Sequence, residues 1–303
     1  MLRKMMKFLY IPREISFLKN EIETVKLLNG RLLTELNRNR IDDFIDNIHL
    51  SEFKVFSQFG DDGIIQFLIN YLKIKNDRFV EFGVENYLES NTRFLLINNN
   101  WSGLVFDALQ DNVNFIKKDK IYWKYDLKAE TSFVTSDNIN SLLKKNGFEG
   151  EIGLLHIDID GNDYWIWKAI EVIEPVIVII EYNSVFGDDK SWTIPYDSKF
   201  YRTKHHFSRL YYGCSILSLC DLAEEKGYAF IGCNSNGNNA YFINKSRLAG
   251  LKKLNAKEGY VLSKFRESRD MNGNLTYQTG ANRIAQIKGM EIFNTRSNLI
   301  EII

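Results

Sequence analysis

Three glutamates crowd a short segment that otherwise has the pattern of a ligand-binding turn. The segment FVEFGVENYLESNT (79–92) begins as an apolar strand, turns and continues toward a helix; it carries Glu81, Glu85 and Glu89 but one glycine, Gly83. In an open α/β sheet, ligands bind beyond the carboxyl ends of the strands, at turns of this kind. Carboxylates there repel a phosphate by about 1 kcal/mol or more per close pair, even in a high dielectric. The segment therefore favours a cationic ligand over a phosphate.

A simpler explanation covers part of this acidic group. Glu85 and Glu89 would also favour the first turn of a helix, because acids there complement the helix dipole. Glu81 lies inside an apolar strand, where an acid without a partner is unfavourable. Glu81 and Gly83 therefore remain candidate cofactor-binding residues.

Asp107 adds a nucleoside contact to the same scheme. It ends the next apolar strand, SGLVFD (102–107), and an acid in that place commonly accepts hydrogen bonds from ribose hydroxyls. The G-x-G-x-x-G pattern that cradles a pyrophosphate is absent, since Val-Glu-Asn-Tyr-Leu follows Gly83. We therefore predict S-adenosylmethionine, a sulfonium nucleoside without phosphate, as the cofactor, with an NAD oxidoreductase as the weaker alternative.

A second acidic group ends the fourth and fifth predicted strands. HIDIDGND (156–163) holds His156, Asp158 and Asp160, which strand alternation would place on one face, and Glu181 ends the next strand. Methyl transfer needs an aligned acceptor and often a base, so these four residues are the candidate catalytic groups. Asp158, Asp160 and Glu181 are also candidate ligands for Mg²⁺ or Mn²⁺. Two alternatives stay open. Asp158 could be a structural acid bonded to the backbone. The protein could also be a metal-dependent glycosyltransferase, although this segment lacks the basic residues that a nucleotide diphosphate needs.

Candidate substrate contacts come from the long irregular segment 184–213 and from FRESRD (265–270). A loop of that length inside a compact domain is usually functional or disordered. Histidines and aromatics with polar tips suit a sugar or another polar acceptor, and an arginine suits an anionic one. The predicted contacts are Tyr196, His205, His206 and Arg266.

Short apolar runs alternating with helical patterns predict the elements that position these groups. Strands are expected at 78–83, 102–107, 121–126, 151–160 and 176–183, and helices at 89–99, 110–118, 136–146, 163–171 and 214–226. This alternation indicates βαβ units and a mostly parallel sheet. YAFIGCN and NAYFINK, joined by SNGN, predict a hairpin at 228–245. The predicted fold class is α/β: a doubly wound, Rossmann-like class I methyltransferase core with a C-terminal β-hairpin and an N-terminal helix.

The first 48 residues predict a separate helical segment. Its apolar residues are spaced as in the a/d seam of a coiled coil, with one asparagine among them: Leu18, Ile22, Val25, Asn29, Leu32 and Leu36. Two interpretations stay open: a homodimer through this helix, and an amphipathic helix that packs on its own domain. The predicted domains are the helical segment 1–48, a cofactor-binding domain 49–245, and a C-terminal extension 246–303 with a substrate-binding role.

Composition narrows the class of partner. The 39 basic and 39 acidic residues cancel, so no net field points to nucleic acid. The three cysteines form no CxxC pair, which favours a reducing compartment. No apolar run reaches the ~18 residues of a membrane-spanning helix, and no small-residue cleavage site follows the basic start MLRKMMKFLY. We expect a cytoplasmic protein without a transmembrane segment, with Arg3, Lys4, Lys7 and Phe8 as a weak candidate for membrane-surface contact.

Several motifs in the same order resemble an uncharacterised branch of the FkbM-like S-adenosylmethionine-dependent methyltransferases. The motifs, within about residues 50 to 285, are SQFGDDGIIQFL, FVEFGVEN…SNTRFLL…WSGLVFD, LLHIDIDGNDYWIW, VIVIIEYNSVFG…PYD, YYGCSILSLCDLAEEKGYAFIGCNSNGNNAYFI and KFRESRDMNGNLTY. The resemblance implies the fold and the cofactor. It also implies a small polar acceptor, such as a sugar or a glycan precursor of surface polysaccharide.

The resemblance implies roles for individual residues around the cofactor. Glu81 and Gly83 would line its methionine end, Asp107 would hold the ribose, and Asp126 would lie near the adenine.

Two further features follow from the resemblance. Gln58 and Asp61 would cap the site from an N-terminal helix, although polar residues at a helix start also explain them. The family pattern has a glycine near position 87, where this chain has Tyr87. A catalytically inactive binding protein on the same fold is therefore a further alternative.

Overall fold

The computed structural model describes the backbone of residues 2–303 and, apart from Ser16, the side chains of residues 14–303. The side chains of Arg3, Lys4, Lys7 and Phe8, suggested above for a membrane surface, lie outside the described residues. Within the described part of the chain, no helix is both long and apolar enough to cross a membrane.

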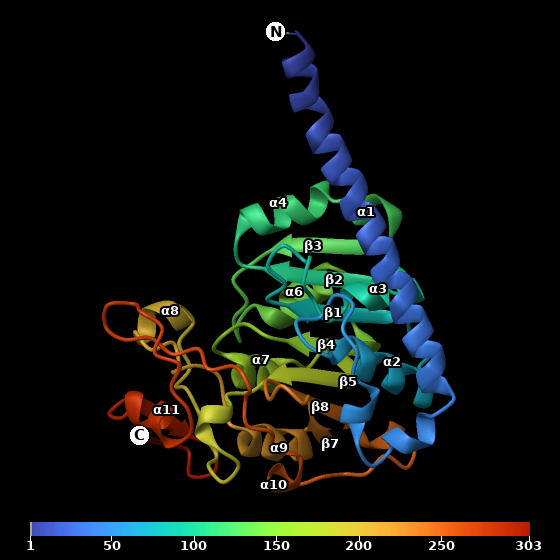
Figure 1. Cartoon of the computed structure of the whole chain (residues 1–303). Helices are drawn as coiled ribbons and strands as arrows, with labels where there is room; N and C mark the ends of the chain where they lie inside the picture. Colours follow the sequence, from blue (N-terminus) through green and yellow to red (C-terminus); the bar gives the residue numbers. More distant parts are fainter. Residues whose placement is uncertain (1) are drawn as a thin grey trace.

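A seven-stranded sheet forms the centre of the molecule (Figure 1). Strands β1 to β5 run parallel in the order β3-β2-β1-β4-β5, and β8 lies between β5 and β7, antiparallel to both. This is the strand order of the class I methyltransferase fold with its terminal hairpin, so the predicted fold class is confirmed. The strands are β1 (Arg78–Phe82), β2 (Ser102–Asp107), β3 (Leu127–Thr131), β4 (Gly150–Ile157), β5 (Ile173–Glu181), β7 (Tyr228–Cys233) and β8 (Asn239–Asn244).

Alternating strand residues supply two hydrophobic cores, one on each face of the sheet. In β5, Ile177 and Ile179 join one core, whereas Val178 and Ile180 join the other. Helices cover both faces, as a doubly wound sheet requires. The helices on the first face are α1 (Leu2–Arg38), α2 (Asp61–Tyr71), α3 (Arg93–Asn99), α4 (Gln110–Lys118) and α5 (Ile121–Lys124). Those on the second face are α6 (Ile139–Lys145), α7 (Asp163–Ala169), α9 (Ile216–Glu225) and α10 (Ala256–Gly259).

The prediction for the third strand is wrong. Residues 121–126 do not pair in the sheet; they contain α5, and β3 follows them. The Asp119 side chain accepts a hydrogen bond from the Ile121 N–H at 3.0 Å, and this local turn favours a helical start over an extended one. Asp126 therefore precedes β3 and lies at the amino end of the strand, the edge of the sheet opposite the one that parallel strands use for ligands.

The segment 184–213 and the C-terminal residues fold together beside the carboxyl ends of the parallel strands. Their three-stranded sheet has the order β10-β9-β6, formed by β6 (Trp192–Thr193), β9 (Glu291–Asn294) and β10 (Leu299–Ile302). A third core, which includes Phe186, Tyr212 and Ile292, holds it together. Figure 1 shows α8 (Arg202–His205) and α11 (Ala281–Gln286) of this lobe on the side toward which the arrows of the parallel strands point.

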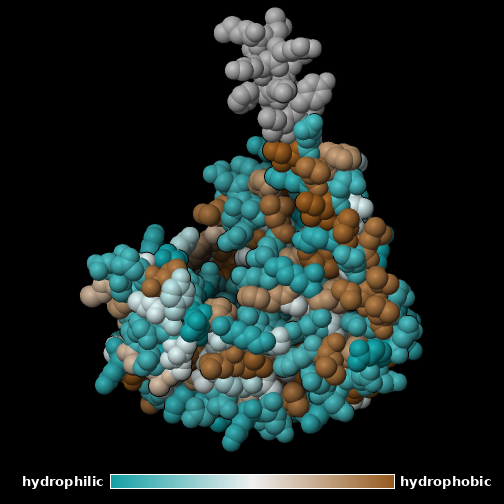
Figure 2. Space-filling view, in the orientation of Figure 1, coloured by the Kyte–Doolittle hydropathy of each residue, from teal (hydrophilic) through white to brown (hydrophobic). Residues whose placement is uncertain are grey.

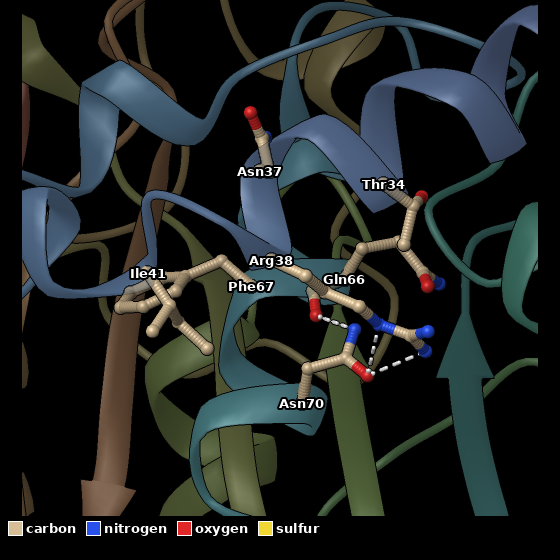
Figure 3. Close-up of a pocket in the computed structure, with 7 residues that line it drawn as sticks. All are labelled: Thr34, Asn37, Arg38, Ile41, Gln66, Phe67 and Asn70. Atoms are coloured by element: carbon tan, nitrogen blue, oxygen red, sulfur yellow. Dashed lines mark hydrogen bonds between the residues drawn. The ribbon is translucent and has the colours of Figure 1, made fainter.

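Helix α1 packs against the domain with its C-terminal half. A Cβ added at Gly30 would meet Val55 Cγ2 at 2.6 Å and Phe94 Cζ at 2.8 Å, so the glycine allows close approach of the helix. Figure 3 shows the contact at the end of the helix, where Arg38 Nη2 donates to Asn70 Oδ1 on α2 at 3.0 Å. These contacts fix the direction in which the rest of α1 leaves the domain.

Candidate functional site

A cavity of about 710 Å³ opens at the carboxyl ends of β1, β2, β4 and β5. The strand order reverses between β1 and β4, which is where doubly wound sheets bind ligands. Figure 2 shows a hollow here, beside the lobe that carries α8 and α11. Among the described residues of the lining, Arg202 is the one Lys or Arg, and the carboxylates are Glu81, Glu85, Glu89, Asp107, Asp158, Asp160, Glu181 and Glu267.

Hydrogen-bond donors enclose the Glu81 carboxylate. Its Oε2 accepts from Ser90 Oγ at 2.6 Å and from the Thr92 hydroxyl. Its Oε1 accepts from the Asn91 N–H at 3.0 Å and lies 2.9 Å from His156 Nδ1. The acid that seemed unfavourable in an apolar strand thus has a full set of partners, which the neighbouring strand β4 and the segment before α3 supply.

Glu81 and His156 form a buried ion pair. Burial alone would raise the pKa of Glu81, but the hydrogen bond and charge of His156 outweigh it and leave the pKa lowered. Burial alone would lower the pKa of His156, but Glu81 outweighs it and leaves that pKa raised. His156 Nε2 lies 3.1 Å from the Asn91 side-chain amide, so both ring nitrogens are engaged. This arrangement does not favour His156 as the catalytic base.

Gly83 lets the turn after β1 press against the end of β4. Its φ is +76°, and an added Cβ would meet the Asp158 carbonyl oxygen at 1.7 Å, so no other residue fits. Tyr87 also has a left-handed backbone, with φ +62°, a conformation that favours glycine. Its ring is fully buried, its hydroxyl lies 2.9 Å from Thr92 Oγ1, and it does not line the cavity. Tyr87 therefore does not narrow the site.

Asp107 stands at the end of β2, where the sequence predicts it. Its Oδ1 accepts from the Leu109 N–H at 2.8 Å and from Asn112 Nδ2 at 2.9 Å. Its Oδ2 accepts from the Glu85 N–H at 2.9 Å and keeps a second lone pair for a ligand. These bonds hold the carboxylate in the lining of the cavity.

The second acidic group converges as the sequence predicts, although for a different reason. The carboxylate oxygens of Asp158, Asp160 and Glu181 lie within 4.8 Å of one another. Strand β4 ends at Ile157, so strand alternation does not extend to the two aspartates; a left-handed Asp160, with φ +56°, shapes the turn instead.

One member of this second group, Glu181, has a carboxylate oxygen without a hydrogen-bond partner among the described residues. Glu181 is 7% exposed, and this oxygen is its Oε2. Burial, reinforced by the Asp158 and Asp160 charges, raises the pKa of Glu181 well above its usual range. Burial and the Asp160 charge raise the pKa of Asp158 to about 6. Close carboxyl groups of this kind hold a shared proton or a bound cation.

Two functional or positioning residues were not predicted. Arg202 on α8 donates to Asp160 Oδ1 at 2.5 Å, and its guanidinium lies 3.7 Å from the Tyr212 ring centroid. No spacing in the sequence marks this arginine. Asp163 accepts from the Ile159 and Gly161 N–H groups at 2.8 and 3.0 Å and thereby holds the turn; its place at the start of a helical pattern is a usable signal.

Asp61 and Asp126 do not line the cavity. Asp61 is buried, and its Oδ1 accepts from Tyr241 Oη at 2.5 Å and from Asn239 Nδ2 at 3.0 Å. It therefore joins α2 to the hairpin. Asp126 is exposed at the far edge of the sheet. Gln58, predicted together with Asp61, does lie in the lining.

The predicted loop contacts point elsewhere. Tyr196 accepts a hydrogen bond from the Ser136 N–H at 3.2 Å. His205 stacks on Phe200 with ring centroids 4.1 Å apart. His206 is partly buried, and burial lowers its pKa. None of Tyr196, His205 and His206 belongs to the described lining of the cavity.

The neighbours of these predicted residues line the site instead. Arg266 is exposed and outside the lining, whereas Phe265 and Glu267 on either side of it belong to the lining. The Phe265 ring lies parallel to Phe59, with centroids 6.4 Å apart, so segments from both ends of the chain meet at the cavity. The loop 184–213 contributes Phe200, Tyr201, Arg202 and Thr203.

The lining fits S-adenosylmethionine better than a dinucleotide. The cavity volume lies within the range of small-molecule sites. Gly83 is the one glycine in its described lining, and Arg202 is already paired with Asp160. A pyrophosphate would find no glycine-rich cradle and no free cation in this lining. A sulfonium and an ammonium would find carboxylates.

No protein-family model matches the chain, and no curated protein matches it. Among solved structures, the chain is similar to a S-adenosylmethionine-dependent methyltransferase from Clostridium acetobutylicum, with 11% identity, a TM-score of 0.40, and coverage of 60% of this chain and 89% of that one. It is also similar to the O-methyltransferase from Bacillus cereus in complex with SAH, with 11% identity, a TM-score of 0.40, and coverage of 72% and 89%. The N-terminal domain of EvdMO1, in the presence of SAH and D-fucose, gives 9% identity, a TM-score of 0.39, and coverage of 68% and 95%. Likenesses this distant carry no function, and the fold assignment rests on the strand order.

Proposed function

We propose that the protein is an S-adenosylmethionine-dependent methyltransferase that acts on a small polar acceptor. One observation carries this proposal: the cavity at the switch point of the sheet is lined by carboxylates, and the one arginine in its described lining is paired with an aspartate. Such a lining attracts a ligand with two positive charges and repels one with phosphates. The sequence resemblance to the FkbM-like methyltransferases supports the same cofactor.

The cofactor would lie across the ends of β1 and β2. Its methionine end would face the turn at Gly83, and its ribose hydroxyls would donate to the remaining lone pair of Asp107. Phe133 and Val134, which follow β3 and line the cavity, replace Asp126 as the proposed neighbours of the adenine.

In this proposal, methyl transfer is an in-line displacement. An acceptor oxygen or nitrogen attacks the methyl carbon, the carbon–sulfur bond breaks, and its electron pair returns to sulfur to give S-adenosylhomocysteine. The acceptor proton goes to the pair formed by Asp158 and Glu181, because burial and the neighbouring charges raise the pKa of both carboxyl groups and so favour uptake of a proton. Asp160 is engaged by Arg202 and His156 by Glu81, so the first pair suits the role of base better.

The same group supports a Mg²⁺ or Mn²⁺ site as a finer proposal. Asp158, Asp160 and Glu181 offer the oxygen ligands that these ions prefer, and Glu181, whose Oε2 has no partner among the described residues, lines the cavity. A bound ion would supply Lewis acidity to an acceptor hydroxyl.

The far wall of the cavity supports a sugar-like acceptor. Phe200 and Tyr201 from the loop, with Phe265 and Glu267 from the C-terminal extension, combine aromatic faces with polar groups. This wall supports a substrate-binding role for the extension 246–303 as part of the proposal. Together with the family resemblance, it favours a sugar or glycan precursor of surface polysaccharide.

Isothermal titration tests the proposal. S-adenosylmethionine and S-adenosylhomocysteine should bind, whereas NAD and a UDP-sugar should not. Asp107→Asn should weaken binding at least about 10-fold, because an amide accepts hydrogen bonds less strongly than a carboxylate. Asp126→Asn, at the opposite edge of the sheet, is the matched control and should bind as the wild type does. The proposal would be refuted if NAD or the UDP-sugar bound more tightly than S-adenosylmethionine, or if Asp107→Asn and Asp126→Asn changed the binding of S-adenosylmethionine equally.

A further inference from the structure

The coiled-coil seam of α1 faces solvent rather than the domain. In heptad notation, Ile22, Asn29 and Leu36 occupy a positions, and Leu18, Val25 and Leu32 occupy d positions. The five apolar members are 52% to 61% exposed. Figure 2 shows apolar side chains along the described part of this helix. A continuous apolar stripe on a surface is a mark of an interaction site.

The opposite side of α1 holds the helix on its own domain. Gly30 and Thr34 are buried, and Leu27 packs against the core of the first face. Glu23 pairs with the buried guanidinium of Arg93 at 3.0 Å. These residues occupy b and f positions, so the domain covers one side of the helix and leaves the a/d side open. The two interpretations of the sequence, a helix that packs on its own domain and a helix that forms a homodimer, therefore concern two different faces of α1.

We propose that α1 pairs with α1 of a second copy of this chain as a parallel, in-register, two-stranded coiled coil. The charges that flank the seam support this occupant and this direction. In a parallel pair, a g residue of one helix meets the e residue five positions later in the other. The pairs are then Glu14 with the partner's Lys19, Glu21 with the partner's Lys26, and Leu28 with the partner's Leu33. An antiparallel pair sets g against g and e against e, which brings like charges together.

Asn29 favours a second copy over an unrelated apolar partner. In a parallel, in-register pair it meets the same residue of the other chain, and the two amides satisfy each other. Against an apolar surface, its amide would lose water without gaining a partner. Because the domain lies on the b and f side, the two domains would sit outside the pair, away from the seam.

Sedimentation of the full chain tests the pairing. The wild type should be a dimer, and Leu18→Glu with Leu32→Glu should raise its dissociation constant at least about 100-fold, because two buried leucines per chain are lost. Ile300→Glu is the matched control: Ile300 is 50% exposed on the edge strand β10 and lies outside the seam, so this variant should remain a dimer. A monomeric wild type, or a dimer that Ile300→Glu dissociates, would overturn the proposal.

Crosslinking and charge reversal test the direction. Leu18→Cys should form a disulfide between chains on oxidation, because a d residue faces its own copy in a parallel pair, whereas Thr24→Cys at a c position should not. Glu21→Lys should weaken the dimer about 10-fold, and adding Lys26→Glu should restore it. No crosslink, together with a stronger dimer for Glu21→Lys, would show an antiparallel pair. A monomer that binds anionic vesicles through the same leucines would show that the seam serves a membrane surface instead.

Discussion

Two buried glutamates line the same cavity, but they differ in their hydrogen-bond partners and in the direction of their pKa shifts. Glu81 at the end of β1 accepts bonds from Ser90, Asn91 and Thr92 and pairs with His156, and its pKa is lowered. Glu181 at the end of β5 is also buried, but one of its oxygens has no partner among the described residues, and its pKa is raised. A buried acid with a full set of partners holds the structure, whereas one without is available to a proton, a metal ion or a substrate.

The largest effect should come from the turn that joins these two regions. Gly83→Ala should lower the free energy of unfolding by at least about 4 kcal/mol, because its Cβ would overlap the Asp158 carbonyl oxygen. Gly147 has the same φ of +76° with nothing within 4 Å of an added Cβ, so Gly147→Ala isolates the cost of left-handed backbone, about 1 kcal/mol. Urea unfolding of both variants measures the difference. Equal losses would mean that the turn does not press on β4.

The second prediction contrasts the two glutamates directly. Glu81→Gln should lower the free energy of unfolding by about 3–5 kcal/mol, because it leaves the buried His156 without its counter-charge. Glu181→Gln should leave stability unchanged or higher, because an amide can donate to Asp158 where a second carboxylate repels it. Glu181→Gln should still reduce methyl transfer at least about 100-fold, because it breaks the pair of carboxyl groups that takes up the acceptor proton.

Urea unfolding together with an assay of methyl transfer from S-adenosylmethionine checks this contrast. Asp158→Asn serves as a second probe of the proposed base and should reduce transfer without a large loss of stability. Equal destabilisation by Glu81→Gln and Glu181→Gln would remove the distinction between a structural and a functional acid.

Sequence patterns located the carboxyl ends of β1 and β2 well and the directions of side chains poorly. The positions of Gly83 and Asp107 follow from apolar runs that stop at a turn, which is a local signal. The partner of Glu81 is not local: His156 reaches it because β1 and β4 pair with Glu81 opposite His156. Asp126 was misplaced because a local turn at Asp119 converted an aromatic run into a helix.

On the substrate side of the cavity, the sequence likewise predicted the right segments but the wrong side chains. The sequence pointed to Arg266, yet its neighbours Phe265 and Glu267 line the cavity. It pointed to the histidines of the loop, yet Arg202 reaches Asp160. The direction of these side chains depends on the third core, in which residues of the loop pack against the C-terminal lobe. No local spacing encodes that packing.

The smallest expected effect separates the two glutamates by the sign of their pH dependence. The lowered pKa of Glu81 means that its carboxylate stabilises the fold above its usual titration range, and this contribution is lost as the pH falls through the folded-state pKa. The raised pKa of Glu181 has the opposite consequence: stability is greatest when it is protonated and is lost as the pH rises through the folded-state pKa. The raised pKa of His156 adds stability that is likewise lost as the pH rises.

Melting temperatures of the variants from pH 8 down to below the ordinary titration range of a glutamate should reveal these signs. The deficit of Glu81→Gln relative to the wild type should narrow only as the pH falls below that range, because the lowered pKa keeps the wild-type carboxylate charged until then. The advantage of Glu181→Gln should grow toward the alkaline end, by about 2–4 °C for each kcal/mol. If the melting temperatures of the two variants changed with pH in the same way, the assignment of Glu81 as a structural acid and Glu181 as a functional acid would be wrong. A hydrogen-bonded acid and an unpartnered acid must differ in the sign of their pH dependence. The crossing of the two trends, rather than the size of either, is what distinguishes the acid that holds the turn from the acid that faces the substrate.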